Sequence, residues 1–289
     1  MAASMAIIGF GEAGRSFATA GGWTAHAFDR LTDDPKTREA KYADYSAAGV
    51  RGVDSLAAAI EGVELILSMV TADQALVVAG TVAESIRAGV FFFDLNSVAP
   101  QTKRAGATLI EGAGGHYLDV AVLAPVNPAQ LAVPLLLSGP QASAGAAMLA
   151  KLGFSRTHAL DGEVGRASAV KMIRSIVVKG IEALTAECLL AADAADVRTE
   201  VLASLDASEK PMRWAERADY NLGRMIEHGE RRSAEMDEVA RTLDDLGVDA
   251  SMARAASRWH KAIGELHLAG PIAGIGAKLP RVRAGTKMP

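Results

Sequence analysis

A glycine-rich segment near the start of the chain, Gly9-Phe10-Gly11-Glu12-Ala13-Gly14, constrains the fold most strongly. It follows a short apolar run, Ala6–Gly9, and precedes an amphipathic stretch, Gly14–Ala20, as a turn between a strand and a helix does. In such a turn the first glycine permits the tight bend, the second lets backbone approach a pyrophosphate, and the third allows close helix–strand packing. The helix N-terminus adds unpaired N–H groups. The segment therefore predicts a dinucleotide-binding βαβ unit in which Gly9, Phe10, Gly11, Glu12, Ala13 and Gly14 contact the cofactor.

An acidic residue stands where such a unit reads the adenosine ribose. Asp29 lies twenty residues after Gly9 and directly after the next apolar run, Thr24–Phe28. A carboxylate there accepts hydrogen bonds from the ribose hydroxyls and repels a 2′-phosphate. The adjacent Arg30 would stack on adenine or bind a 2′-phosphate if Asp29 turned away. We expect NAD or NADP as cofactor, with NAD favoured; the alternative is a glycine turn that serves only the fold.

The first half of the chain alternates short apolar runs with amphipathic segments, which is typical of a doubly wound α/β sheet. Further strands are expected at Leu65–Met69, Val90–Asp94, Tyr117–Leu123 and Pro134–Leu137, and helices at Ala72–Arg87 and Pro100–Ala105. Ligands bind at the carboxyl ends of such strands. The loop residues expected to contact the cofactor are therefore Val70, Thr71, Asn96 and Ser97. Capping of the helix at Pro100 is a compatible role for Asn96 and Ser97.

The pattern changes after Gly165. Arg166 to about Asp193 predicts one long helix, the chain stays helical to about Leu268, and the Gly-, Pro- and basic-rich stretch Gly270–Pro289 predicts an extended tail. We therefore expect a Rossmann-type NAD(P)-binding domain over residues 1–165 and an interdomain helix over 166–193. An all-helical domain for substrate binding or dimerisation is expected over 194–289.

The long helix carries a lysine among apolar residues. A buried stripe is expected from Val170, Ile173, Val177, Ile181 and Leu184, and a neighbouring face holds Lys171, Arg174 and Ser175. Burying an ammonium is costly unless it has a partner or a use. Desolvation and the nearby Arg174 would lower the pKa of Lys171, which suits a general acid/base. The alternative is a surface lysine whose stem covers apolar surface.

Together these motifs resemble the β-hydroxyacid dehydrogenase superfamily, which includes 3-hydroxyisobutyrate and 6-phosphogluconate dehydrogenases. The resemblance rests on the glycine motif, the strand at 119–122 and the Gly162-x-x-Gly165 that precedes Lys171. Segments 118–125 and 134–140 resemble a subgroup that joins a 6-phosphogluconate-dehydrogenase-type NAD-binding domain to a C-terminal domain of unknown function. The resemblance implies a Rossmann domain, a catalytic lysine at Lys171, and a helical domain that mediates dimerisation.

The substrate segment departs from the family pattern. The usual Ser-Gly-Gly falls on Leu123-Ala124-Pro125, and Ser175 replaces the asparagine expected four residues after the lysine. Val178 stands where decarboxylating 6-phosphogluconate enzymes carry a glutamate, which excludes that reaction. The lysine–aspartate pair of the later helical domain is not evident. The substrate contacts we expect are Val122, Leu123, Arg174 and Ser175, with Arg174 binding a carboxylate.

The leading hypothesis is an NAD(P)-dependent dehydrogenase or reductase that acts on a CH–OH group. A hydride would pass between nicotinamide and a small hydroxyacid, or a related carbinol or carbonyl, with Lys171 as general acid/base. One alternative is an imine reductase of the same superfamily, a group that generally lacks a lysine here. The other is a cofactor-binding sensor or interaction protein without turnover, which the altered substrate segment motivates.

Composition excludes other classes. A net charge of −4 does not indicate binding to nucleic acid or to an anionic membrane, because both attract basic surfaces. The single cysteine, Cys188, excludes an internal disulfide framework, and the six histidines show no metal-binding spacing, so we expect no metal site. No apolar run reaches the roughly 18–20 residues that span a bilayer. We expect a cytoplasmic homodimer that binds a small-molecule substrate and neither membrane nor nucleic acid.

Overall fold

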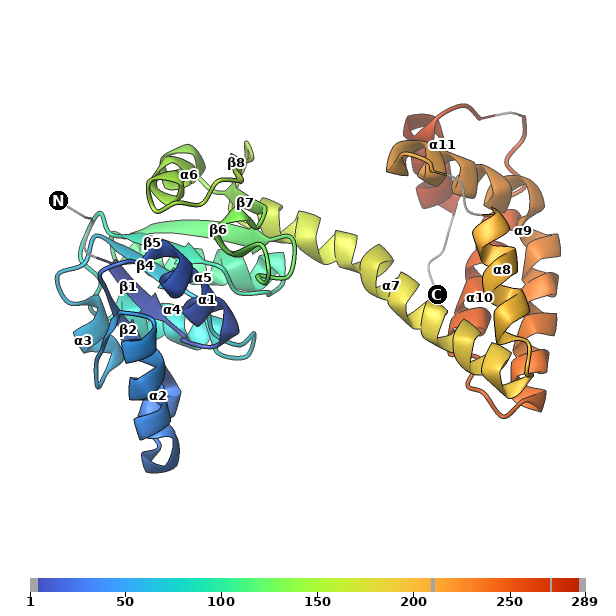
Figure 1. Cartoon of the computed structure of the whole chain (residues 1–289). Coiled ribbons are helices and arrows are strands. Elements are labelled where there is room, and N and C mark those ends of the chain that lie inside the picture. The colour runs from blue at the N-terminus through green and yellow to red at the C-terminus, as the bar shows by residue number, and fades with distance from the viewer. Residues whose placement is uncertain (1–4, 209–210, 271, 286–289) are drawn as a thin grey trace. The chain divides into compact units, whose positions relative to one another are not determined.

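The computed structural model describes residues 5–208, 211–270 and 272–285 of the chain (Figure 1). The internal contacts divide it into two compact units, Met1–Ile176 and Val177–Pro289. The division falls inside a 29-residue helix, α7 (Arg166–Ala194). The first unit is an α/β domain, and the described part of the second contains helices and connecting loops.

Within the described residues of the first unit, eight strands form one sheet in the order β3-β2-β1-β4-β5-β6-β7-β8. Their bounds are β1 (Met5–Ile8), β2 (Ala25–Phe28), β3 (Arg51–Gly52), β4 (Leu65–Ser68), β5 (Phe91–Asp94), β6 (His116–Val122), β7 (Leu135–Ser138) and β8 (Thr157–Ala159). Neighbouring strands run parallel except β6 and β7, which are antiparallel. The chain order reverses at β1, which pairs with β2 on one side and β4 on the other. The predicted doubly wound α/β sheet is confirmed.

Helices cover both faces of this sheet (Figure 1). They are α1 (Glu12–Gly21), α2 (Pro35–Ala47), α3 (Leu56–Ile60), α4 (Ala75–Ala83), α5 (Pro100–Gly112) and α6 (Ala142–Lys151), with short 3₁₀ turns η1 (Arg30–Thr32) and η2 (Gln130–Ala132). Adjacent strand residues enter opposite cores: Phe93 packs with α1 and α6, and Phe92 with α4 and α5. This alternation follows from the period of two of a strand. It explains why three successive residues of β5, Phe91 to Phe93, are apolar.

The second unit is built on a close helix pair, α9 (Trp214–Asp245) and α10 (Ser251–Gly264). Two glycines let the backbones touch: a Cβ on Gly229 would lie 2.3 Å from the His260 carbonyl oxygen, and one on Gly264 would lie 2.5 Å from the Glu230 nitrogen. The Ser233 and Ser257 hydroxyls, both buried, are 2.9 Å apart across the same pair. His228, beside this crossing, has a non-helical backbone (φ −130°, ψ 16°) that kinks α9. One further helix, α8 (Arg198–Ser208), lies between α7 and α9 along the chain.

The structure corrects the expectation of an extended C-terminal tail. Residues Ile275–Gly285 form a helix, α11, despite the proline within it. Lys278 is buried and its Nζ donates to the Asp219 carbonyl oxygen at 2.8 Å and approaches Asp219 Oδ1 at 2.9 Å, while Val282 is also buried. These tertiary contacts override the unfavourable local composition. Residues 271 and 286–289 of the predicted tail lie outside the described residues.

The expected buried stripe on α7 is likewise corrected. Its members Val170, Ile173, Val177, Ile181 and Leu184 are 41–67% exposed. The described elements of this single chain do not cover that side of the helix, so apolar periodicity identified the face but not its burial. No helix in the described ranges is long and apolar enough to cross a membrane.

Candidate active site

Two glycines of the nucleotide loop are required by the chain itself. Gly9 has a φ of +86°, and a Cβ there would lie 2.3 Å from the Met69 carbonyl oxygen. A Cβ on Gly14 would lie 2.6 Å from the Gly9 carbonyl oxygen. Gly9 is therefore needed for the β1–α1 turn to pack against the loop after β4, and Gly14 for α1 to pack against that turn.

Gly11 is different, because nothing in the chain demands a glycine there. Its φ of −81° is one that any residue adopts, and an added Cβ would meet no atom within 4 Å. Gly11 precedes the ten-residue helix α1 and supplies no side-chain cap, so the first N–H groups of that helix keep no partner within the helix. An open space in front of unpaired N–H groups fits a pyrophosphate lying against the backbone. The residues present thus fit a dinucleotide.

Asp29 holds the glycine loop. Its Oδ2 accepts the Phe10 N–H at 2.7 Å and its Oδ1 accepts the Leu31 N–H at 3.0 Å. On the other side, Lys41 Nζ donates to the Phe10 carbonyl oxygen at 2.9 Å. The Phe10 peptide is therefore held from both sides. Each Asp29 oxygen keeps a further lone pair for a ribose hydroxyl, since a carboxylate oxygen accepts two hydrogen bonds. Arg30, the next residue, is exposed.

A cavity of about 450 Å³ opens at the carboxyl ends of the strands. It is lined by Ala13, Phe17, Met69, Val70, Thr71, Ala72, Leu95, Asn96, Ser97, Val122, Ala124, Pro125, Val126 and Lys171. The structure thus brings together α1, the loops after β4, β5 and β6, and the first turns of α7. Seven of the residues singled out from the sequence, Ala13, Val70, Thr71, Asn96, Ser97, Val122 and Lys171, line this one cavity.

Lys171 contributes the ammonium of this cavity. Its side chain is half-buried, and Nζ donates a short hydrogen bond to the Ser97 hydroxyl. Ser175 donates from its Oγ to the Lys171 carbonyl oxygen at 2.8 Å, so it follows the helix backbone. Arg174 is exposed, and neither it nor Ser175 lines the cavity. Leu123 also lies outside the lining, where its N–H bonds to the Pro134 carbonyl oxygen at 3.0 Å.

Asn96 ties the two cofactor-facing loops together. Its Oδ1 accepts the Val70 N–H at 2.6 Å, and its Nδ2 donates to the Ser68 hydroxyl at 3.0 Å. Its own N–H donates to Asp94 Oδ1 at 2.8 Å. The amide is buried, so these bonds are shielded from water and hold the loop after β4 against the loop after β5.

Sequence reasoning missed a buried charge cluster below the cavity. Lys103 of α5 is fully buried, and its Nζ lies 3.0 Å from Asp94 Oδ1 and 3.5 Å from Asp119 Oδ1. Tyr117 donates its hydroxyl to Asp94 Oδ2 at 2.5 Å. Burial, together with Asp94, raises the pKa of Tyr117 far above its usual value, so this phenol stays a donor. The sequence did carry a signal for this cluster, namely polar residues inside strands that are otherwise apolar. Such residues predict a buried cluster because buried charges need partners.

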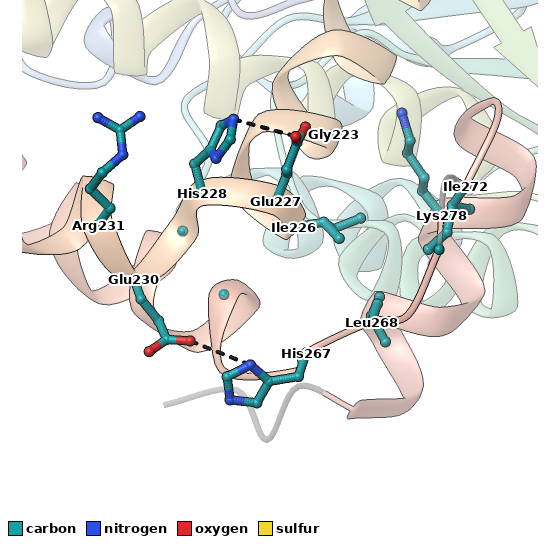
Figure 2. A pocket seen from close by; sticks show the side chains of 13 residues that line it. Gly223, Ile226, Glu227, His228, Glu230, Arg231, His267, Leu268, Ile272 and Lys278 are labelled. Atoms are coloured by element: carbon teal, nitrogen blue, oxygen red, sulfur yellow. Dashed lines mark ion pairs between the residues drawn. The ribbon is translucent and has the colours of Figure 1, made fainter.

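A second hollow, of about 970 Å³, lies in the helical unit beside the kink of α9 (Figure 2). Two histidines face glutamates there: His228 Nε2 is 3.6 Å from Glu227 Oε1, and His267 Nδ1 is 3.4 Å from Glu230 Oε1. None of the site residues expected from the sequence lines this hollow. Within the described residues, no cluster of three or more histidine, cysteine or carboxylate side chains is arranged to hold a metal ion.

The first unit is therefore a Rossmann-type nucleotide-binding domain with an ammonium at its ligand edge. Residues 4–153 match the model of the NAD binding domain of 6-phosphogluconate dehydrogenase, and residues 192–263 match a domain of unknown function, DUF1932. The chain belongs to this family of the β-hydroxyacid dehydrogenase superfamily, in the group that joins these two domains. The resemblance inferred from the sequence is confirmed. A comparison with curated proteins gives no match.

Solved structures extend the comparison over the whole chain. A conserved hypothetical protein from Sinorhizobium meliloti 1021 is 34% identical over 98% of this chain and 97% of its own, with a TM-score of 0.62. The conserved protein MTH1747, whose structure shows similarity with 3-hydroxyacid dehydrogenases, is 27% identical over 91% of this chain and 97% of its own (TM-score 0.58). A Streptomyces aurantiacus imine reductase is 20% identical over 97% and 98% (TM-score 0.72) and shares the fold.

Proposed function

We propose that this protein is an NAD(P)-dependent oxidoreductase with Lys171 as its general acid/base. The substrate is a small hydroxyacid or a related carbinol or carbonyl. One observation carries the proposal: the Lys171 ammonium meets the Ser97 hydroxyl inside a cavity that α1 and the loops after β4 and β5 of a nucleotide-binding sheet also line. An ammonium at the edge where such folds bind ligands suits proton transfer to a substrate oxygen.

Different parts of the site bind different parts of the dinucleotide. The loop Gly9–Gly14 holds its phosphates, and Asp29 holds the adenosine ribose. The loops at Val70-Thr71 and Asn96-Ser97 hold the remainder of the cofactor. The bound cofactor supplies or accepts the hydride. Lys171 Nζ gives or takes the hydroxyl proton and stabilises charge that develops on the substrate oxygen. Ser97 fixes the ammonium by accepting one of its three N–H donors. Phe17, Met69 and Val122 give the cavity apolar walls that limit water.

Arg174 is the proposed carboxylate-binding group. It stands three residues after Lys171, on the neighbouring face of α7, and its side chain is exposed. A guanidinium binds a carboxylate through two parallel N–H donors, which fixes orientation as well as charge. A hydroxyacid held in this way would present its hydroxyl carbon within one helical turn of the lysine.

NAD is the favoured cofactor. Asp29 accepts two backbone N–H groups, which supports a carboxylate placed beside the glycine loop. A fixed negative charge there accepts ribose hydroxyls and repels the 2′-phosphate of NADP. Arg30, the residue that would bind a 2′-phosphate, is exposed.

A second copy of the chain is proposed as the partner of the exposed apolar face of α7. Ile173, Ile176 and Ile181 are 67%, 73% and 50% exposed. Single exposed apolar residues are ordinary, but a row of them along one helix marks an interaction surface. A face repeated on two identical helices is self-complementary about a two-fold axis. We therefore propose a homodimer formed through this face.

Reduction of an imine is the second candidate reaction. The similarity in fold to the imine reductase from Streptomyces aurantiacus, over nearly the full length of both chains, favours it. A C=N bond needs the same hydride donor and a nearby proton donor. The two reactions differ in the bond reduced, so cofactor consumption with hydroxyacids and carbonyl compounds, on one hand, and imines, on the other, separates them.

Replacing Lys171 with methionine tests the role of the ammonium. With a substrate found in that panel, we expect Lys171→Met to lower kcat by about 10²- to 10⁴-fold, the usual contribution of a general acid or base. The Kd of the cofactor should not change, because no step of its binding uses this ammonium. Lys179→Met is the matched control, since Lys179 is an exposed lysine of the same helix. Turnover that survives in Lys171→Met assigns proton transfer to another group.

A further inference from the structure

We propose that Asp119, a residue of β6, is a positioning residue for Lys171. Its buried carboxylate fixes the start of α7, and through it the place of the ammonium beside Ser97. The importance of this placement for turnover rests on the proposed function, whereas the placement itself does not.

One carboxylate oxygen of Asp119 accepts four hydrogen bonds at the beginning of α7. Oδ2 accepts the backbone N–H of Gly165 at 3.1 Å and that of Ser168 at 3.0 Å. It also accepts the hydroxyls of Ser168 at 3.0 Å and Ser138 at 3.1 Å. The Ser138 hydroxyl in turn accepts the Ala167 N–H at 3.0 Å. The first donors of a helix have no partner inside it, and here side chains of two strands of the sheet accept the N–H groups of Ala167 and Ser168.

Electrostatics strengthen this anchor. A carboxylate is stabilised at the positive end of a helix, and here Lys103 Nζ also lies 3.5 Å from Asp119 Oδ1. Asp119, Ser138 and Lys103 are each fully buried. Water therefore cannot replace a bond that breaks, so the carboxylate holds the helix start at one place.

The same cluster also holds the partner of the lysine. Lys103 Nζ binds Asp94 Oδ1, and Asp94 Oδ1 accepts the N–H of Asn96, the residue before Ser97. Asp119, the other acid beside Lys103, binds Ser168. Ser168 stands three residues before Lys171, one helical turn away. Asp94 thus holds the loop that carries Ser97, and Asp119 holds the start of the helix that carries Lys171. Loss of the Asp119 anchor would move the ammonium relative to the serine.

An isosteric change tests the proposal. In Asp119→Asn the charge and part of the acceptor capacity disappear while the side-chain volume stays. We expect kcat to fall by about 10- to 100-fold, as for a small misplacement of a reacting group, with KM and cofactor Kd within about twofold of wild type. The readout that does not depend on activity is the pH titration of Lys171, followed by NMR on protein with ¹³C-methylated lysines and assigned with Lys171→Arg. Its midpoint should shift in Asp119→Asn.

Ser55→Ala is the matched control. The Ser55 hydroxyl caps α3 in the same unit by accepting the Ala58 N–H at 3.1 Å, far along the chain from this cluster. Loss of that cap should leave both the Lys171 titration and kcat unchanged.

If Asp119→Asn fails to fold, Ser138→Ala replaces it. This variant keeps the charge of Asp119 and removes the acceptor of the Ala167 N–H. The same changes in kcat and in the Lys171 titration are then expected.

The outcomes separate this inference from the proposed function. A folded variant of the anchor with the wild-type Lys171 titration and wild-type kcat overturns the positioning role. If Lys171→Met keeps its turnover, the catalytic proposal fails. A shifted Lys171 titration in Asp119→Asn would still support the anchor in that case.

Discussion

Gly11 and Gly14 stand three residues apart in the nucleotide loop, yet different constraints act on them. A Cβ on Gly14 would collide with the Gly9 carbonyl oxygen at 2.6 Å, whereas a Cβ on Gly11 would enter open space. Gly14 is therefore explained by packing, and Gly11 by room for a ligand. Near them, Phe10 is held by Asp29 at its N–H and by Lys41 at its carbonyl. These two hydrogen bonds hold the loop without a ligand, and a loop held in this way loses less entropy on binding.

Alanine substitutions at these two glycines should separate fold from binding. We expect Gly14→Ala to lower the free energy of unfolding by about 1–3 kcal/mol, as overpacking does. Gly11→Ala should cost at most about 1 kcal/mol, because glycine caps a helix better than alanine does.

Cofactor titration of the same proteins completes this prediction. Gly11→Ala should raise the Kd about tenfold or more, about 1.4 kcal/mol, because the methyl group occupies the place of the pyrophosphate. Chemical denaturation and fluorescence titration with NADH and NADPH measure both quantities, and wild type should bind NADH more tightly. Unchanged binding of both cofactors by Gly11→Ala would show that this space takes no pyrophosphate.

At the scale of elements, helices of this protein are set by contacts distant in the sequence. The α9–α10 pair depends on Gly229 and Gly264, where the two backbones meet without side chains between them. α11 forms around a proline because Lys278 reaches Asp219 and Val282 is buried. α7 begins at Arg166 with an aspartate of β6 as its cap. In each case tertiary contacts outweigh a weak local preference.

The helix pair supplies a prediction of its own. Gly229→Ala places a methyl group 2.3 Å from the His260 carbonyl oxygen, so α9 and α10 must move apart. We expect a loss of about 1–3 kcal/mol in the stability of the helical unit, measured by urea denaturation monitored at Trp259. Gly276→Ala in α11 is the control, because its Cβ would meet nothing within 4 Å. That change should stabilise by about 0.5–1 kcal/mol, since alanine favours a helix over glycine. Equal destabilisation by both would contradict the close crossing.

At the scale of the whole molecule, the chain presents apolar residues that its own described elements leave exposed. They follow α7, the helix that carries Lys171 near its start. A homodimer through this face would shield them, and it would give the long helix a stabilising neighbour. The proposed assembly and the proposed active site thus share one element, although the exposed isoleucines and the lysine occupy different positions on it.

Charge placed on this face should separate the copies. Sedimentation velocity is expected to show a dimer for wild type and a monomer for the double variant Ile176→Glu/Ile181→Glu, because two buried carboxylates per chain would oppose association. Lys179→Glu is the control that adds a charge at an exposed polar position of the same helix. A wild-type monomer at micromolar concentration would contradict the assembly, and a dimer that survives the double substitution would move the interface elsewhere.

The fold class and the family could be predicted from the sequence because their signals are local. The glycine motif, the acid twenty residues later and the alternation of apolar runs each depend on neighbours along the chain. The strand bounds agree with the structure to within one residue at β1, β2, β4, β5, β6 and β7. The two-residue β3 and the three-residue β8 are too short for any periodicity to show.

Of the candidate site, the sequence alone determined which residue types stand at the ends of strands and on the long helix. Only the tertiary structure decided that Lys171 meets Ser97, and that Arg174 and Leu123 lie outside the cavity. It also decided that Asp119 caps a helix 46 and 49 residues further along the chain. The physical reason is that strand order in the sheet, and not distance along the chain, brings β6, β7 and the start of α7 together. A buried carboxylate reveals its partners only once that order is known.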